Sequence, residues 1–206
     1  NIRTSAAMEP LGCLGDLGWY CIRLSLWAMN YESPVSVRGR IHAEHDGVPI
    51  EFSGELTFAN GVTASFYNSF RTGHQEWANL SGTEGYLKLN DFVLPFAGNG
   101  TQFSVVKSRF DLNGCQFDMH EGRKVFTVAE SPNNAPQSQE AGMVRTFSDL
   151  VLSGRRDDFW PRIALLTQQV MDAPRIMRPL VSLRTSGLLT RSTSPKLVAM
   201  QWLNTL

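Results

Sequence analysis

The hydrophobic residues of this chain change their spacing along the sequence, and this change limits the folds it can adopt. Between Ile50 and Phe70, apolar and polar residues alternate on both sides of Asn60-Gly61. This dipeptide is typical of a two-residue type I′ hairpin turn, because both positions need positive φ. The sequence therefore predicts an antiparallel hairpin. Further strands are expected over residues 74–81, 86–93, 102–108 and 124–129, separated by Gly, Asn and Asp clusters.

Helices are expected at both ends of this strand-rich part. Over residues 16–29, Leu17, Cys21 and Leu24 recur at helical spacing. Strands grouped together, with helices segregated at the two ends, predict an α+β domain with one helix-covered antiparallel sheet.

Two later helices follow a loop at residues 132–136. The first is expected around residues 143–151, with Ser138 as its N-cap and Gly154 ending it. The second is expected to begin at Pro161, a residue suited to the first helical position, and to run to Asp172.

The last residues differ in character. Residues 174–206 contain three prolines and a Ser/Thr-rich run without sustained periodicity. The sequence therefore predicts a domain over residues 1–173 and a weakly structured tail over residues 174–206. Within the tail, residues 196–206 are expected to dock through Val198 and Trp202.

The composition excludes several classes of protein. The 206 residues carry 19 basic and 19 acidic side chains, whereas a nucleic-acid-binding protein normally has a basic surplus. No apolar run reaches the roughly 18–20 residues that cross a bilayer. Three cysteines do not make a disulfide framework. We expect a soluble, cytoplasmic protein that binds neither nucleic acid nor membrane.

Common catalytic and metal-binding motifs are missing. The histidines and cysteines have no metal-ligand spacing, so no metal site is predicted. The sequence contains no G-x-S-x-G elbow, no P-loop and no G-x-G-x-x-G.

One pair of residues remains as candidate chemistry. Asp16 and Tyr20 are four residues apart at the start of the first expected helix, so they share a face, and Arg23 lies close to that face. A carboxylate can accept a hydrogen bond from a substrate hydroxyl, and a phenol can give or take a proton. Alternatively, Asp16 only favours the helix N-terminus and Tyr20 packs on the sheet. Spacing alone leaves both interpretations open.

The segment that contains this pair resembles a known motif. Gly12-Cys-Leu-Gly-Asp-Leu-Gly-Trp-Tyr-Cys-Ile-Arg23 resembles the G-x-L-x-D-x-G-x-[HY] segment that opens the C-terminal domain in the glucose–fructose oxidoreductase/inositol dehydrogenase (Gfo/Idh/MocA) family. It is most similar to the branch of dimeric dihydrodiol dehydrogenase, D-xylose dehydrogenases and related plant oxidoreductases. Residues 80–87, 139–147 and 160–163 resemble later parts of that branch.

The resemblance implies a fold and an activity. It implies a large, mostly antiparallel open sheet covered on one face by helices, like the C-terminal domains of dihydrodipicolinate reductase and glyceraldehyde-3-phosphate dehydrogenase, with homodimerisation through the sheet. It also implies hydride transfer between NAD or NADP and a sugar, polyol or cyclic diol. Asp16 would bind the substrate and Tyr20 would move the proton, with Trp19 and Arg23 as further substrate-binding residues.

The sequence also departs from the family. The family's N-terminal dinucleotide-binding domain and the lysine of its E-K-P motif have no counterpart in these residues. We therefore expect a C-terminal domain that is inactive alone and binds no cofactor by itself. Its tail would be a divergent extension or the product of a shifted reading frame. The alternatives are a non-catalytic binding or oligomerisation module with the same fold, and an acid/base enzyme without a cofactor.

Overall fold

The computed structural model describes residues 2–96, 101–128, 136, 138–173 and 197–205, the last range by its backbone alone. Its described part contains one eight-stranded sheet with the strand order β1-β2-β3-β8-β4-β5-β6-β7. The strands are β1 (Ser36–His45), β2 (Val48–Thr57), β3 (Thr63–Ser69), β4 (Gln75–Gly82), β5 (Gly85–Leu89), β6 (Thr101–Asn113), β7 (Gln116–Val128) and β8 (Leu197–Thr205). Neighbouring strands are antiparallel except β3 and β8, which are parallel.

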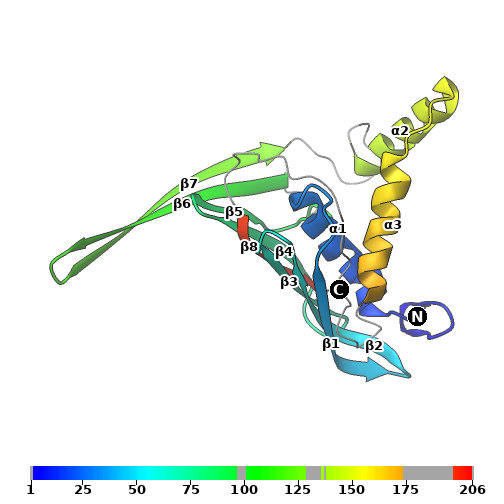
Figure 1. Cartoon of the computed structure of the whole chain (residues 1–206), viewed down its shortest axis with the longest axis horizontal. Coiled ribbons are helices and arrows are strands. Elements are labelled where there is room, and N and C mark those ends of the chain that lie inside the picture. The colour runs from blue at the N-terminus through cyan, green and yellow to red at the C-terminus, as the bar shows by residue number, and fades with distance from the viewer. Residues whose placement is uncertain (1, 97–100, 129–135, 137, 174–196, 206) are drawn as a thin grey trace.

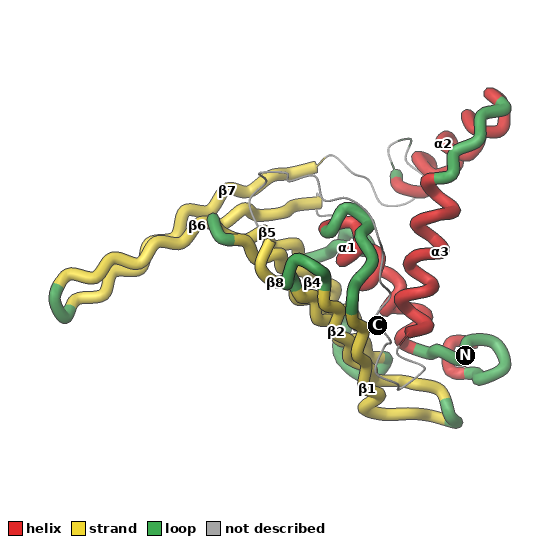
Figure 2. The backbone as a smooth tube through the Cα atoms, in the orientation of Figure 1, coloured by secondary structure: helices red, strands yellow, loops and turns green. Residues whose placement is uncertain are grey.

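Helices cover one face of this sheet and leave the other open. The π-helical turn η2 (Leu14–Gly18) continues directly into α1 (Trp19–Ala28), and α3 (Phe159–Asp172) packs beside α1. Figures 1 and 2 show α1 and α3 on the same side of the sheet. The α+β class and the helix-covered antiparallel sheet expected from the sequence are confirmed.

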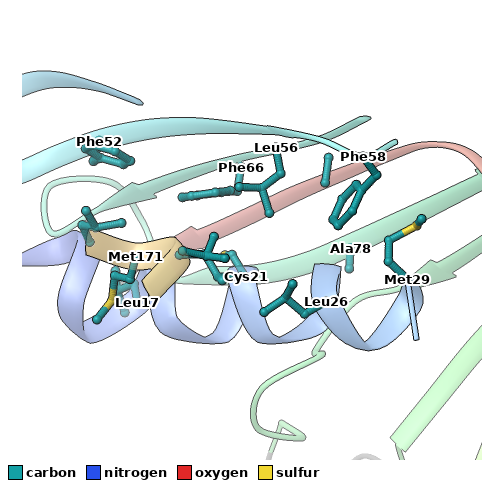
Figure 3. Close-up of a cluster of buried hydrophobic side chains, with 14 of the residues drawn as sticks. Leu17, Cys21, Leu26, Met29, Phe52, Leu56, Phe58, Phe66, Ala78 and Met171 are labelled. Atoms are coloured by element: carbon teal, nitrogen blue, oxygen red, sulfur yellow. The ribbon is translucent and has the colours of Figure 1, made fainter. Parts of the chain in front are cut away.

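The core lies between α1 and the first strands. Leu17, Cys21 and Leu26 from the helical side meet Phe52 and Leu56 from β2, and all five are buried (Figure 3). Their spacing agrees with the periods of the two kinds of element. The helical residues recur at four- and five-residue intervals, about one helical turn, and the apolar residues of β2 alternate with polar ones. Burial of these apolar side chains is the main driving force that fixes the helix on the sheet.

The predicted hairpin is correct, but its turn differs from the prediction. β2 and β3 pair antiparallel, with Leu56 opposite Ala64. Phe58 N–H donates to the Val62 carbonyl at 2.9 Å, so residues 59–61 form a three-residue connection. Among these residues, Gly61 has positive φ (84°) and Asn60 does not. The expected two-residue type I′ turn, which needs positive φ at both positions, is therefore wrong.

The later helices agree with the sequence in their caps. α2 (Gln139–Ser153) begins after Ser138, whose Oγ accepts a hydrogen bond from the Ala141 N–H at 3.2 Å, and ends at Gly154 with φ of 64°. In contrast, α3 begins at Phe159. The helix therefore starts two residues before the expected position, and Pro161 lies in its first turn.

The last strand corrects part of the predicted tail. Residues 197–205 form β8, which pairs with β3 on one side and β4 on the other. This segment is therefore a central strand of the sheet rather than weakly structured chain. Residues 174–196, for which weak structure was also expected, lie outside the described residues. A domain boundary at residue 173 stays a prediction.

Two elements extend away from the body (Figures 1 and 2). The strands β6 and β7 pair along their whole length, from Thr101 opposite Val128 to Asn113 opposite Gln116, and their far half passes beyond the sheet. Helix α2 has no buried residue and projects from the opposite end of the molecule.

Candidate functional site

The candidate site begins at the turn that leads into α1. Gly12 has φ of 52° and lies against the carbonyl of Pro49, where a Cβ atom would collide with backbone. Asp16 N–H donates to the Gly12 carbonyl at 3.0 Å, and the chain then passes through the π-helical turn Leu14–Gly18. Single π-helical turns occur frequently at functional sites, because they change the direction in which side chains project.

Asp16 lies within this π-helical turn and is paired with a cation. Its Oδ2 lies 3.2 Å from Nε of Arg3, and the Asp16 side chain is 23% exposed. Oδ2 itself is buried, and the ion pair lacks hydrogen-bond geometry, so this atom has no hydrogen-bond donor among the described residues. Because the Asp16 side chain as a whole still reaches solvent, its carboxylate is suited to receive a hydroxyl donor.

Tyr20 is the second residue of α1, and its side chain is 45% exposed. This exposure argues against the alternative that Tyr20 merely packs on the sheet. A solvent-facing phenol at the start of a helix can exchange a proton with a bound molecule. The next residue, Cys21, is buried in the core. Tyr20 therefore lies on a different face of α1 from the residues that pack against the sheet.

Trp19 and Arg23 form a second pair on α1. The Arg23 guanidinium carbon lies 5.4 Å from the centre of the Trp19 ring, a cation–π distance. Burial lowers the pKa of Arg23, and Tyr31 opposes this shift. Nε of Arg23 is buried with no hydrogen-bond partner in the described part of the chain.

The structure therefore adds a residue that sequence analysis missed. The cation beside Asp16 is Arg3, from the short 3₁₀ segment η1 (Ile2–Thr4). Arg23, which the sequence placed near the face of Asp16 and Tyr20, lies over the ring of Trp19. No periodic pattern links residues 3 and 16, so nothing in the sequence could have identified this ion pair.

The other titratable residues have structural surroundings. No group of three His, Cys, Asp or Glu side chains suited to a metal ion occurs among the described residues. Burial raises the pKa of both the Cys13 and the Cys21 thiols to about 12. Both thiols are therefore protonated at neutral pH and poor nucleophiles. No helix in the described ranges is long and apolar enough to span a membrane.

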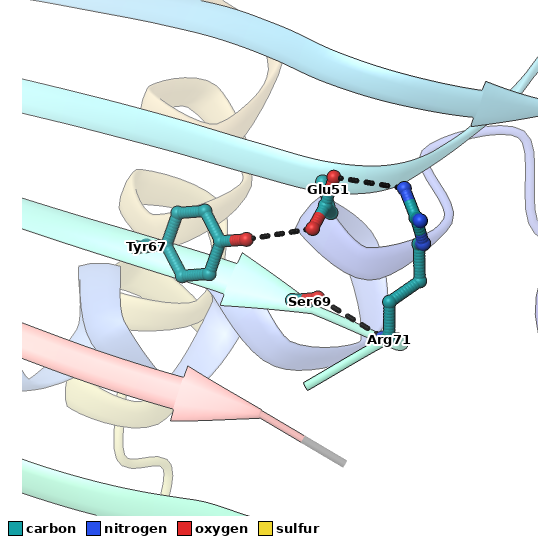
Figure 4. Close-up of polar contacts among 4 residues, drawn as sticks. All are labelled: Glu51, Tyr67, Ser69 and Arg71. Carbon is teal, nitrogen blue, oxygen red and sulfur yellow. Dashed lines mark hydrogen bonds and ion pairs between the residues drawn. The ribbon is translucent and has the colours of Figure 1, made fainter. Parts of the chain in front are cut away.

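A polar cluster on the open face links two strands (Figure 4). The Tyr67 hydroxyl donates to Oε1 of Glu51 at 2.9 Å, and Nη1 of Arg71 lies 3.3 Å from Oε2 of the same carboxylate. The Arg71 N–H also donates to Ser69 Oγ at 3.0 Å. Burial raises the pKa of Tyr67, which makes it a weaker acid than a free phenol. This cluster holds the ends of β2 and β3 together.

Comparison with known protein families places the candidate pair inside a recognised segment. Residues 1–88 match the family model described as the GFO/IDH/MocA C-terminal domain. The matched part includes the π-helical turn, α1 and the first four strands, and it covers less than half of the chain.

Solved structures share the fold over a longer part of the chain. The 3-ketoreductase KijD10 from Actinomadura kijaniata, solved in complex with NADP and TDP-benzene, is 22% identical with a TM-score of 0.65, over 85% of this chain and 48% of that chain. A putative NADPH-dependent oxidoreductase from Desulfitobacterium hafniense is 16% identical with a TM-score of 0.61, over 87% of this chain and 50% of that one. UDP-N-acetylglucosamine 3-dehydrogenase GnnA from Acidithiobacillus ferrooxidans is 14% identical with a TM-score of 0.53, over 81% of this chain and 47% of that chain.

These matches define the class of fold. The chain has the α+β fold found in these oxidoreductases, in agreement with the family-model match to a GFO/IDH/MocA C-terminal domain. It spans about half the length of the solved structures that it matches.

Proposed function

We propose that this chain is the C-terminal, substrate-binding and dimerisation part of an NAD(P)-dependent oxidoreductase of the GFO/IDH/MocA family, acting on a hydroxyl or carbonyl group of a sugar, polyol or cyclic diol. The observation that carries the proposal is the arrangement of Asp16 and Tyr20. An acceptor carboxylate and an exposed phenol lie four residues apart across a π-to-α transition, inside the segment that matches the family model.

The two side chains have complementary tasks in this proposal. The Asp16 carboxylate accepts a hydrogen bond from a substrate hydroxyl and so orients the sugar. The Tyr20 hydroxyl gives a proton to the substrate oxygen when a carbonyl is reduced, and the reverse transfer accompanies oxidation. Trp19 offers a flat apolar surface to the substrate, and the Arg23 guanidinium, 5.4 Å from the centre of the Trp19 ring, adds a positive charge.

The nicotinamide cofactor supplies or accepts the hydride in such a reaction. The donor set at Asp16 and Tyr20 fits the substrate side of that chemistry, but the sequence has no glycine-rich phosphate-binding motif. We therefore propose that the dinucleotide is bound by residues outside this chain's site and that the chain alone is inactive. NADP is the form named for KijD10, and either NAD or NADP is compatible with the residues described here.

Finer parts of the proposal rest on the sequence and on the uncovered face of the sheet. The residues from Asp16 to Arg23 favour the dihydrodiol dehydrogenase and D-xylose dehydrogenase branch. The uncovered sheet face favours a homodimer that pairs through it. A cytoplasmic location also stays a prediction.

A second function has one observation in its favour. The open face of the sheet carries polar side chains and a shallow hollow lined by Arg38, Arg40, Ser53, Glu55 and Ser65, among others. A non-catalytic binding or oligomerisation module would need only such a face, and Asp16 and Tyr20 would then be structural.

Substitution of the pair distinguishes the two functions. In the complete oxidoreductase, Tyr20→Phe is expected to lower kcat/KM by about 10²–10⁴-fold, the usual contribution of general acid–base catalysis. Asp16→Asn is expected to lower it about 10–100-fold, since a hydrogen bond to a charged group is worth about 1.5–3 kcal/mol.

The matched control is Tyr67→Phe, which removes another phenol that is paired with a carboxylate. It is expected to leave kcat/KM close to that of the unchanged protein, because Tyr67 lies on the open face. Near-normal kcat/KM in both Tyr20→Phe and Asp16→Asn would contradict the assigned roles and favour the binding module.

A further inference from the structure

The hairpin of β6 and β7 extends beyond the sheet as a two-stranded arm, here defined as residues 107–122. Figure 1 shows that it leads away from α1 and α3. Within the described residues, β7 pairs only with β6 and forms one edge of the sheet. An isolated two-stranded ribbon is only marginally stable in water, so an arm of this length calls for an additional support.

The two faces of the arm differ sharply in chemistry. Phe110 lies opposite Met119, and Leu112 lies opposite Phe117, so all four side chains share one face. Each of them is between 52% and 71% exposed. The rings of Phe110 and Phe117 stack with their centres 5.7 Å apart, which joins the four side chains into one apolar patch.

The other face of the arm carries ion pairs. Nη2 of Arg109 lies 2.8 Å from Oδ2 of Asp111, and Nε2 of His120 lies 3.3 Å from the same oxygen. A ribbon that is apolar on one side and charged on the other is typical of strands that are buried on one side. Contiguous exposed apolar patches of this kind mark interaction surfaces.

The strand register relates this patch to the open face of the sheet. Phe66 and Phe52, which face the helices, define the covered side, and Tyr67, Lys88 and Ser104 alternate to the other side. Ser104, Val106 and Ser108 lead to Phe110 by steps of two residues, so the patch continues the open face. A two-stranded ribbon twists strongly, which turns the patch progressively along the arm.

We propose that the apolar face of the arm packs on the open sheet face of a second copy of this chain, so that two copies exchange arms around a twofold axis. The inference rests on the dimerisation that is part of the proposed function, and it names the element that forms the contact. In an isologous dimer, each chain contributes one arm and one acceptor face.

The area available agrees with a stable dimer. An aromatic side chain buries about 150–250 Å² when it is fully covered, so the exposed parts of the two rings, together with those of Leu112 and Met119, offer on the order of 400 Å² per arm. Each chain buries its own arm and the face covered by its partner's arm. The total is about 800 Å² per chain, which is the usual size of a specific interface.

The formal net charge of the chain is zero at pH 7, so two copies can associate without long-range repulsion. A further observation favours a second copy over another part of the same protein. A dinucleotide-binding part would have to approach Asp16 and Tyr20 on the helix-covered side, whereas the patch continues the opposite face.

The first test is the dissociation constant of the dimer, measured by sedimentation. The variant Phe110→Ser/Phe117→Ser removes two exposed rings, so the fold and the circular dichroism spectrum should stay unchanged. The dimer is expected to dissociate at least tenfold more readily. The matched control is Met143→Ser/Phe147→Ser on α2, where both side chains are 67–68% exposed, and it should leave the dissociation constant unchanged.

The second test uses the cysteine at the tip of the arm. Cys115 is exposed, and Cys13 and Cys21 are buried, so a benzophenone maleimide will attach to the arm alone. Irradiation of a mixture of ¹⁴N- and ¹⁵N-labelled chains is expected to give mixed-isotope crosslinks to open-face residues of β1–β5.

The possible results separate this inference from the proposed function. A chain that stays monomeric at high concentration would overturn the arm exchange and the dimer, while the roles of Asp16 and Tyr20 would be untouched. A dimer that is insensitive to the arm variant, or crosslinks that fall on α2 or α3, would overturn the arm exchange alone.

Discussion

Nε of Arg3 lies 3.2 Å from Oδ2 of Asp16, which joins the first described residues of the chain to the π-helical turn before α1. Arg3 is about half exposed, whereas Oδ2 of Asp16 is buried. The guanidinium therefore covers one oxygen of the carboxylate and fixes the orientation of the side chain. In the proposed function, Arg3 is a positioning residue for Asp16.

Replacement of Arg3 should affect substrate binding more than stability. Because partly exposed ion pairs contribute about 0–1 kcal/mol, Arg3→Gln is expected to lower the free energy of unfolding by less than about 1 kcal/mol. In the complete oxidoreductase, KM should rise severalfold with a smaller change in kcat, since the carboxylate still accepts a hydrogen bond but is less well oriented.

Two further variants separate positioning from a general structural effect. Arg3→Lys restores a cation and should recover part of the lost affinity. Arg71→Gln removes a comparable ion pair, with Glu51 on the open face, and should not change KM. An unchanged KM in Arg3→Gln would contradict the positioning role.

Two glycines of the same segment should differ greatly in their tolerance of alanine. Gly12 has φ of 52°, and a Cβ there meets the backbone carbonyl of Pro49. Left-handed backbone at a non-glycine residue costs about 1–3 kcal/mol, and backbone cannot easily move away. Gly12→Ala is therefore expected to lower the free energy of unfolding by about 2–4 kcal/mol, measured by urea denaturation.

Gly15→Ala is the matched control. A Cβ at Gly15 meets the end of the flexible Glu9 side chain and lies 3.0 Å from Cβ of Leu11. The Glu9 carboxylate can move at the cost of its hydrogen bond from the Leu11 N–H, and Leu11 needs to shift by only a few tenths of an ångström. Since alanine also favours helical backbone by about 1 kcal/mol over glycine, the net change should be below about 1 kcal/mol. Equal effects of the two variants would show that the conformation of Gly12 is not a requirement of the fold.

The fold could be predicted where local patterns and burial agree. The alternation between Ile50 and Phe70 identified β2 and β3, because one face of these strands is covered by α1 and selects apolar residues at every second position. Ser138 and Gly154 likewise marked the ends of α2, since both act within one turn of the helix.

Other features were missed for identifiable reasons. The two strands that form the arm were predicted too short, over residues 102–108 and 124–129. Phe110, Leu112, Phe117 and Met119 alternate with polar residues on both sides of Asn113-Gly114, as apolar residues do around Asn60-Gly61. The central position of β8 depends on pairing with β3, about 130 residues earlier in the chain, and no local pattern encodes such pairing. The same limit applies to Arg3, whose role depends on a contact between distant residues.

Glu76 should make the stability of the chain depend on pH in the mildly acidic range. Its side chain is buried, and the Leu94 N–H lies 3.3 and 3.4 Å from its two carboxylate oxygens. Burial raises the pKa of Glu76 above its ordinary value of 4.5. The folded chain therefore holds this proton more tightly than the unfolded chain. The free energy of unfolding falls as the pH rises from 4.5 through the raised pKa of the folded chain.

Glu76→Gln keeps an acceptor for the Leu94 N–H and removes the charge. Its free energy of unfolding should no longer decline between pH 4.5 and the raised pKa, and near pH 7 the variant should be at least as stable as the unchanged chain. The comparison is Glu55→Gln, which alters an exposed carboxylate on β2. A variant less stable than the unchanged chain at pH 7 but not at pH 4 would contradict the role of burial.

The buried cysteines should limit stability on the alkaline side. Burial raises the pKa of the Cys21 thiol from 9.0 to about 12, against a hydrogen bond from Asn68 Nδ2 at 3.4 Å that lowers it. Between these two pH values the unfolded chain releases the thiol proton and the folded chain keeps it. The free energy of unfolding should therefore fall as the pH rises above 9, by up to about 1.4 kcal/mol per pH unit for each buried thiol.

Cys21→Ala should make this decline shallower, because one of the two buried thiols no longer titrates on unfolding. The variant will begin from a lower stability, since it leaves a cavity and removes a partner of Asn68. The informative quantity is therefore the slope between pH 9 and 10.5, from urea denaturation at several pH values. Tyrosine and lysine side chains also titrate in this range, but they do so in both proteins and cancel in the comparison. Cys115→Ala, at an exposed position, should leave the slope unchanged, and an equal slope in Cys21→Ala would mean that the Cys21 thiol does not resist ionisation in the folded chain.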